Sequence, residues 1–96
     1  MPAVCRIGDA DVPHCSPMVR AVGSTNVFVN GIGISRQGDV NTIHLLPGIP
    51  CPSHARPITI GSTSVFVNGV GCGRIGDSIS ACTSVAAGST NVFAGG

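Results

Sequence analysis

The stretch GSTNVFVNGIGISRQGD, residues 23–39, recurs almost unchanged as GSTSVFVNGVGCGRIGD at residues 61–77. A third copy starts at residues 88–96, GSTNVFAGG, and breaks off after its first half. The chain also begins inside a copy, because CRIGD at residues 5–9 matches the second half. Such self-similarity indicates that three related units build the fold together.

Each complete copy has the pattern of a β-hairpin. The residues STNVFV at 24–29 are rich in β-branched and aromatic types, which favour strands. Asn30-Gly31 follows this arm, and Asn68-Gly69 holds the same place in the second copy. Asn-Gly between two apolar runs is the strongest short hairpin signal, because both turn residues need positive φ. The second arm of each copy then ends at a Gly-Asp pair.

The half copies at the two chain ends predict how the fold closes. The first arm at 88–93 has no second arm after it, and the second arm at 2–9 has no first arm before it. Because an unpaired edge strand promotes aggregation, we expect these two segments to pair with each other. The pairing would complete a third hairpin and close a ring of three units with pseudo-threefold symmetry.

Length and composition agree with a single all-β domain formed by residues 1–96. The chain contains twelve Val, nine Ile and six Thr, but only two Leu, no Lys and no Glu, so helix formers are scarce. The repeat units are residues 23–44, 61–82, and 88–96 completed by 1–14. The only aromatic residues occupy one slot per unit, as Phe28, Phe66 and Phe93. We interpret these three rings as core residues packed around the pseudo-threefold axis.

Residues of metal-ligand type lie at the same distance beyond each unit. Counting five residues on from the three Gly-Asp pairs gives His14, His44 and Cys82. Related loops around a pseudo-threefold axis would bring these side chains to one point, and zinc takes four His or Cys ligands in a tetrahedron. His54 lies in the Pro-rich segment 40–60, which departs from the repeat, and would supply the fourth ligand. This closed set predicts one structural Zn²⁺ that stabilises a small domain.

Other cysteines compete for these positions. Cys15 follows one predicted His ligand directly, and Cys51 lies three residues before another, so either thiol can replace a predicted ligand. Cys5 and Cys72 lie on second arms, where we favour burial as small apolar residues over metal binding.

Each unit also places an Arg three residues before its Asp, in the pairs Arg6–Asp9, Arg36–Asp39 and Arg74–Asp77. Two interpretations are open: contact with a partner protein, or a local ion pair that fixes the turn. We favour the local pair, which contributes only ~0–1 kcal/mol when exposed.

The composition limits the classes of function. Charged residues make up 9% of the chain and the formal net charge is +1, so there is no basic stripe for nucleic acid. Neither a signal peptide nor an apolar run long enough to cross a bilayer is found, which predicts synthesis in the cytoplasm. A three-His zinc with an open fourth position could activate water, as in a small zinc metallohydrolase. That alternative lacks a general base, because the chain has no Glu and three of its four Asp belong to repeat turns.

Over essentially its whole length the chain resembles the PAAR-repeat family, the tip proteins of contractile injection machines. The resemblance rests on the hairpin motifs at 23–31 and 61–69, each followed by Arg-x-Gly-Asp. It also rests on residues that stand where family members carry zinc ligands, namely His14, His44, His54 and Cys82. The tetrapeptide that names the family is reduced in this chain to its Arg.

The resemblance implies a small β cone with one structural Zn²⁺ near its apex. The base would cap a trimeric β-helical spike, one tip per trimer, in a bacterial type VI secretion system or a phage tail. The implied function is membrane piercing without catalysis, with transient contact to the target membrane and effector cargo as a further candidate partner. The protein would then leave the cytoplasm through the injection machine or as part of the virion tail.

Overall fold

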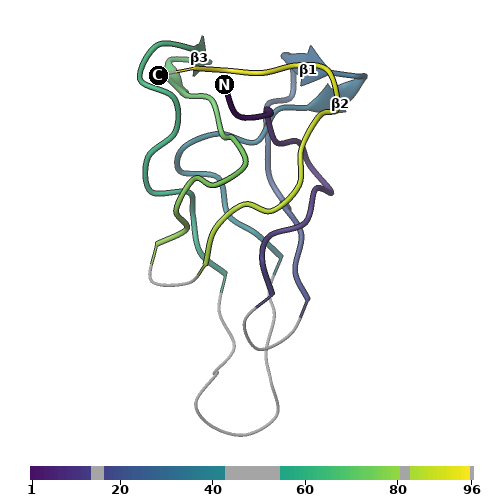
Figure 1. The fold of residues 1–96 in the computed structure, drawn as a ribbon, viewed down its shortest axis with the longest axis vertical. Coiled ribbons are helices and arrows are strands. Elements are labelled where there is room, and N and C mark those ends of the chain that lie inside the picture. The colour runs from purple at the N-terminus through teal and green to yellow at the C-terminus, as the bar shows by residue number, and fades with distance from the viewer. Residues whose placement is uncertain (14–16, 43–54, 81–82, 96) are drawn as a thin grey trace, which may run out of the picture.

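The computed structural model describes residues 1–13, 17–42, 55–80 and 83–95. Their regular secondary structure consists of two antiparallel hairpins, and no helix occurs in these ranges (Figure 1). The first hairpin pairs β1 (Phe28–Val29) with β2 (Ile32–Gly33), and the second pairs β3 (Phe66–Val67) with β4 (Val70–Gly71). Single bridges connect the remaining segments. The described part of the chain is therefore all-β, as the sequence predicts.

Both hairpins turn on the Asn-Gly pairs. φ is 55° and 76° across Asn30-Gly31, and 54° and 83° across Asn68-Gly69. Positive φ at both central residues gives the primed turn, whose twist matches that of the flanking strands. A two-residue turn also fixes the register, so that Val29 lies opposite Ile32 in the first hairpin.

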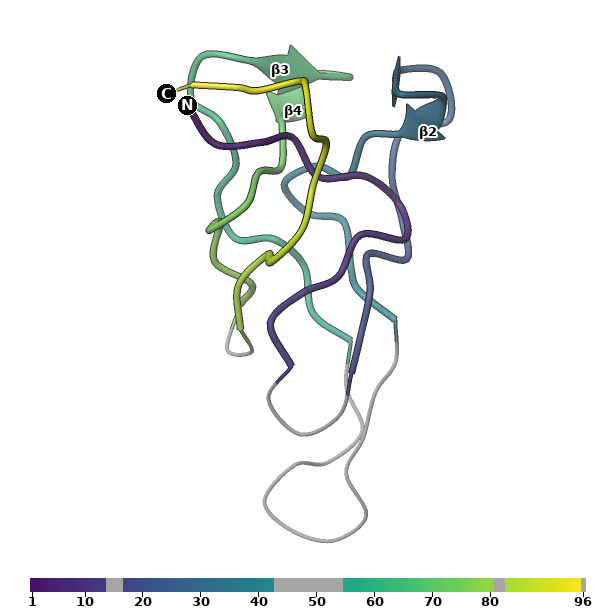
Figure 2. The ribbon, with the colours of Figure 1, turned by 45° about the vertical axis from the view of Figure 1, so that its right-hand side comes forward.

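The chain ends form the predicted third hairpin. Ala3 is bridged to Phe93, the pairing that β1 and β2 make in the first hairpin. The Val4 N–H donates to the Val92 carbonyl at 3.0 Å, and the Ser89 N–H donates to the Val4 carbonyl at 2.8 Å. The same two bonds recur in both complete units. The two termini lie near each other, at the end of the molecule that holds β1–β4 (Figures 1 and 2).

A ring of three backbone hydrogen bonds joins the units at the centre. The N–H of Cys5 donates to the carbonyl of Gly73, and the N–H of Gly73 donates to the carbonyl of Ser35, each at 3.0 Å. The N–H of Ser35 closes the ring by donating to the carbonyl of Cys5 at 3.1 Å. The three residues hold the same slot in their units. Each unit thus donates one bond to one neighbour and accepts one from the other, which confirms closure into a ring.

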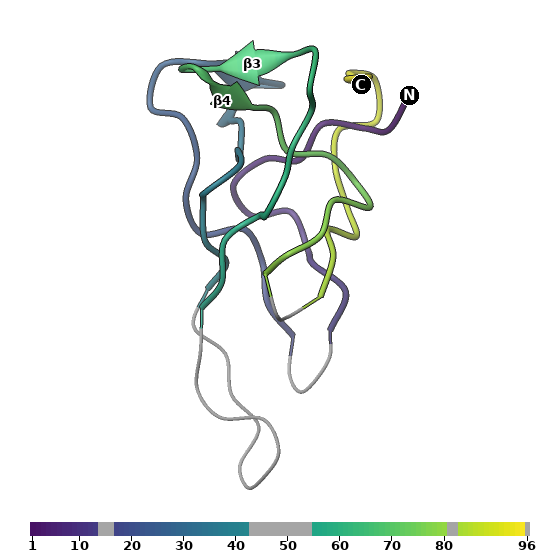
Figure 3. The same ribbon diagram turned by 90° about the vertical axis from the view of Figure 1, so that its left-hand side faces the viewer.

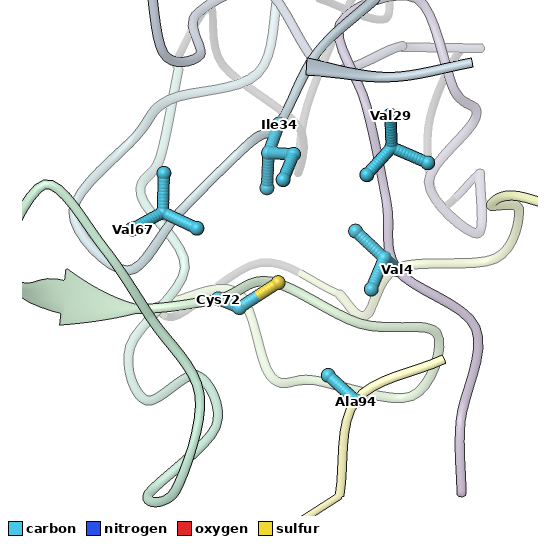
Figure 4. Close-up of a cluster of buried hydrophobic side chains, with 6 residues drawn as sticks. All are labelled: Val4, Val29, Ile34, Val67, Cys72 and Ala94. Carbon is cyan, nitrogen blue, oxygen red and sulfur yellow. The ribbon is translucent and has the colours of Figure 1, made fainter. Parts of the chain in front are cut away.

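The core beneath the hairpins contains two sets of equivalent side chains (Figure 4). The second arms contribute Val4, Ile34 and Cys72, and the first arms contribute Val29, Val67 and Ala94. Each of these residues is 8% exposed or less, and their side chains converge from all three units. Small and β-branched side chains suit this core because three units of the same chain approach one another closely around one axis.

The three phenylalanines are not core residues, so the interpretation of their slot was wrong. Phe28, Phe66 and Phe93 expose 56%, 60% and 50% of their surface. Successive side chains of a strand point to opposite faces, and only one of two neighbours can face the axis. In the first hairpin Val29 takes the inward position, which directs Phe28 outward.

Candidate functional site

The predicted zinc ligands, His14, His44, His54 and Cys82, all lie outside the described residues. The competing thiols of Cys15 and Cys51 lie outside them as well. In the ranges that the structure describes, no group of three or more His, Cys, Asp or Glu could hold a metal ion. The ligand set therefore stays a prediction.

A second ring of three backbone hydrogen bonds joins the segments that flank residues 14–16, 43–54 and 81–82, which the structure does not describe. Each bond links the segment that precedes one of these three ranges to the segment that follows a different one. Backbone N–H groups donate to carbonyls at 2.8–2.9 Å in the pairs Val12 to Ser84, Thr42 to Val19 and Ser80 to Pro57. In Figure 3 these segments lie at the lower end of the described part of the chain, away from β3 and β4. The described residues next to the predicted ligands in the sequence are thus linked in one ring.

Each unit ends in a turn that an ion pair fixes. Nε of Arg6 lies 2.9 Å from Oδ2 of Asp9, and Nη2 lies 3.0 Å from Oδ1. The same two-point contact is made by Arg36 with Asp39 and by Arg74 with Asp77. The Gly before each Asp has a φ of 90–91°, as the third position of a type II turn requires. The local Arg–Asp pair favoured from the sequence is confirmed.

The remaining nitrogen of each Arg crosses to the next unit. Nη1 of Arg6 donates to Oδ1 of Asn30 at 3.2 Å, and Nη1 of Arg36 donates to Oδ1 of Asn68 at 2.8 Å. At the third junction a Gly stands in the Asn slot, and Arg74 donates to the carbonyl of Gly95 at 3.0 Å. Hydroxyls of the first-arm serines bind the same three oxygens. Side chains of the neighbouring units therefore hold each hairpin turn in place.

The hairpin end presents apolar side chains to solvent. We call the surface formed by the three equivalent phenylalanines, Phe28, Phe66 and Phe93, the hairpin face. Each of these rings exposes half or more of its surface. The three hairpin sequences, residues 23–33, 61–71 and 88–96, contain no charged side chain. Exposed aromatic side chains on an uncharged surface are typical anchors of a protein–protein interface.

Cys5 and Cys72 are buried free thiols, as expected from their positions on second arms. They are 0% and 1% exposed. Burial raises the pKa of Cys5 from 9.0 to about 12 and the pKa of Cys72 to about 11. Because the thiolate is the metal ligand, thiols that stay protonated at neutral pH are poor candidates for metal binding.

Comparison with known proteins does not identify the chain: no family model matches it, and no curated protein matches it. None of the described residues belongs to a helix long and apolar enough to cross a membrane.

Proposed function

We propose that the protein is a non-enzymatic tip that caps a trimeric β-helical spike of a contractile injection machine, either a type VI secretion system or a phage tail. The observation that carries the proposal is the hairpin face, where Phe28, Phe66 and Phe93 occupy equivalent positions in a ring of three units. A single chain of this kind offers the same contact to each of three identical partner chains. One tip would then satisfy one trimer.

The phenylalanines supply the apolar contact that such docking needs. Each ring leaves half or more of its surface in water, so a partner can gain roughly 1–1.5 kcal/mol from covering each one. The hairpin turns are already held by hydrogen bonds from neighbouring units, which lowers the entropy lost on binding. A partner end that is apolar, uncharged and threefold symmetric matches this face best.

We also propose one structural Zn²⁺ at the opposite end, held by His14, His44, His54 and Cys82. Three imidazoles and one thiolate form a donor set that suits tetrahedral zinc. The ring of hydrogen bonds from Val12, Thr42 and Ser80 supports the proposal, because it links the described residues that flank the predicted ligands in the sequence. A bound metal would stabilise a chain whose strands are only two residues long. A conical outline with the Zn²⁺ near its apex belongs to the same proposal.

A catalytic role finds no support among the carboxylates. Three of the four Asp side chains are paired with Arg in the repeat turns. The fourth, Asp11, is 2% exposed and lies 3.0 Å from a nitrogen of Arg20. A small zinc metallohydrolase needs a group near the metal that can take a proton from water, and the chain has no Glu for this purpose.

As a tip, the protein would be made in the cytoplasm and carried out by the injection machine or as part of the virion tail. It would touch the target membrane only in transit and would need no nucleic acid. Effector cargo is a further candidate partner. These assignments follow from the proposed role, so failure to dock to a spike would refute them as well.

The decisive experiment measures the stoichiometry of docking. The purified protein is mixed with a trimeric β-helical spike protein from the same genome, and the mass of the complex is measured by native mass spectrometry. We expect one chain per three spike chains, and no complex when Phe28, Phe66 and Phe93 are all changed to Thr. Ile60→Thr is the matched control, because Ile60 is 61% exposed but lies outside the hairpin face. Three tips per trimer, or normal binding by the triple variant, would refute the proposal.

A further inference from the structure

The third hairpin differs from the other two because no turn of the chain joins its arms. Its second arm lies in residues 2–9 and its first arm in residues 88–95, far apart in the sequence. In each complete unit an Asn-Gly turn with positive φ connects the arms directly. We call the pairing of residues 2–4 with residues 89–94 the seam. In the described part of the chain, non-covalent contacts alone hold the two sides of the seam together.

The backbone hydrogen bonds of the seam match those of the complete units. The Ser89 N–H donates to the Val4 carbonyl at 2.8 Å. The equivalent N–H groups of Ser24 and Ser62 donate within their own hairpins at the same distance. A difference in strength between the three hairpins must therefore come from side chains and from the missing turn.

The side chains of the seam pack less closely than those of the complete units. Ala94 takes the core position that Val fills in both complete hairpins, so the seam buries two carbon atoms fewer there. A Cβ at Gly33 or Gly71 would overlap the carbonyl of the serine on the opposite arm. The third hairpin has Ala3 in this slot, so its arms cannot approach each other as closely.

The contact that holds the hairpin turn is also reduced at the seam. Nδ2 of Asn30 donates to Oδ1 of Asn91 at 3.0 Å, and this bond joins the first turn to a neighbouring unit. Nδ2 of Asn68 makes the equivalent bond to Oδ1 of Asn26 at 2.9 Å. Gly95 occupies the same slot in the third hairpin and has no side chain to donate. The seam is therefore the weakest of the three hairpins.

The first arm of the seam can separate without disturbing the rest of the fold. Among the described residues, the arm 88–95 forms backbone hydrogen bonds only with Pro2 and Val4. The chain just before it is anchored elsewhere, because the Ala87 N–H donates to the Ala10 carbonyl at 3.0 Å. Segments with few partners of this kind open locally at a smaller free-energy cost than global unfolding.

We propose that the seam opens locally in the free protein and that docking of the spike on the hairpin face closes it. This inference rests on the proposed function. Phe93 lies in the seam and supplies one of the three rings of the hairpin face, so a partner that covers all three rings binds the closed form. A ligand that binds one of two forms shifts the population toward that form. Docking would thus complete the ring as well as cap the spike.

Amide hydrogen exchange of the whole chain tests the proposal, because the three hairpins contain equivalent serines as internal controls. In the free protein the Ser89 amide should exchange roughly tenfold faster, or more, than the amides of Ser24 and Ser62, since the missing carbon atoms alone correspond to about this factor. Saturating trimeric spike should slow the Ser89 amide to the range of the two controls. Equal exchange of all three serines in the free protein would overturn the proposal.

A disulfide across the seam shows whether its opening causes the fast exchange. Ala3 and Phe93 are bridged, and hydrogen bonds flank this pair on both sides. Such non-hydrogen-bonded pairs bring their Cα atoms close enough for a disulfide. In the variant with Ala3→Cys and Phe93→Cys, oxidation should slow the Ser89 amide to the rate of Ser24, whereas the reduced form should exchange at least as fast as the wild type. Equal exchange in the oxidised and reduced forms would contradict the proposal.

Failure of the proposed function gives a different result. If the wild type forms no complex with the spike, docking is refuted, and the proposed closure of the seam is refuted with it. A complex of one chain per trimer in which the Ser89 amide keeps its fast exchange would refute the closure of the seam alone and leave docking in place.

Discussion

Threonine substitutions at two neighbouring residues should distinguish the hairpin face from the core. Phe28 and Val29 together form β1, and they expose 56% and 8% of their surface. Both changes introduce the same β-branched residue, so strand propensity is similar in the two variants. The difference between them then reports on which side of the hairpin each side chain lies.

The structure gives the expected size of each effect. Phe28 buries less than half of its side chain, and a fully buried Phe contributes up to ~3 kcal/mol, so Phe28→Thr should cost about 1 kcal/mol. Val29→Thr keeps the shape but places a hydroxyl in an apolar core, which should cost about 2–3 kcal/mol. For a domain of this size, 1 kcal/mol shifts Tm by about 4–8 °C. Val29→Thr should therefore melt about 5–15 °C below Phe28→Thr.

The assay must avoid intrinsic fluorescence, because the chain has neither Trp nor Tyr. Thermal unfolding followed by far-UV circular dichroism and by calorimetry gives Tm and the unfolding enthalpy for both variants. Equal losses of stability would mean that the Phe28 ring is as buried in solution as Val29. That result would refute the outward placement of the ring and remove the hairpin face as a docking surface.

Three further predictions concern the metal, the buried thiols and the backbone ring. Elemental analysis should find one zinc per chain, and a chelator should lower Tm by about 10 °C or more. Cys82→Ala should destabilise the protein more than Cys72→Ala. A protein that contains no zinc after metal-free purification would refute the proposed zinc site. Folding raises the pKa of Cys5 from 9.0 to about 12 and the pKa of Cys72 from 9.0 to about 11. Above pH 9 the unfolded chain therefore loses these two protons before the folded protein does. The free energy of unfolding should fall by about 1.4 kcal/mol per pH unit for each thiol above pH 9, with no loss below pH 9. Cys5→Ala should then roughly halve the slope of Tm between pH 9 and 11, and an unchanged slope would contradict the role of its burial. Gly73→Ala would bring a Cβ within 2.6 Å of a carbonyl oxygen of the ring and should cost about 1–3 kcal/mol, whereas Gly95→Ala, which meets only the flexible Met1 side chain, should change Tm little.

The repeat predicted the closure of the fold because backbone pairing depends on the pattern of arms and turns. Two half copies at the chain ends were enough to predict that the terminal segments pair, and the bridge between Ala3 and Phe93 confirms this pairing. The Arg–Asp pairs were predictable for a similar reason, since a spacing of three residues across a Gly turn brings the two side chains together. These features are local or follow directly from the repeat.

The orientation of the phenylalanines was missed although the sequence contains its signal. In the arm 24–29 the residue next to the turn is Val29, and alternation along the arm then puts Phe28 on the opposite face. The aromatic residue was assigned to the core because of its size, whereas the axis is lined by smaller side chains from three units.

The buried contact of Asn41 with Asp11 could not be predicted, because no spacing rule connects the two segments that carry these residues. The ion pair of Arg20 with Asp11 is local, since the bridge between Ala10 and Val19 pairs their two segments, and it was missed. The only hint was a charged residue inside the apolar run PMVRAV at 17–22. For the predicted zinc ligands the reverse holds, because the sequence proposes three of them by a common offset and His54 from the Pro-rich segment, whereas all four lie outside the described residues.

The central triangle of hydrogen bonds has a mechanical consequence for the proposed role as a tip. A force on one unit is passed through Cys5, Ser35 and Gly73 to both of its neighbours, because each of them donates a bond in one direction and accepts one from the other. No unit can be displaced along the axis without straining two of these bonds, and the Arg side chains repeat the same linkage nearer the hairpins. In the proposed role, a force applied at the hairpin face would thus be shared by all three units, although each strand is only two residues long.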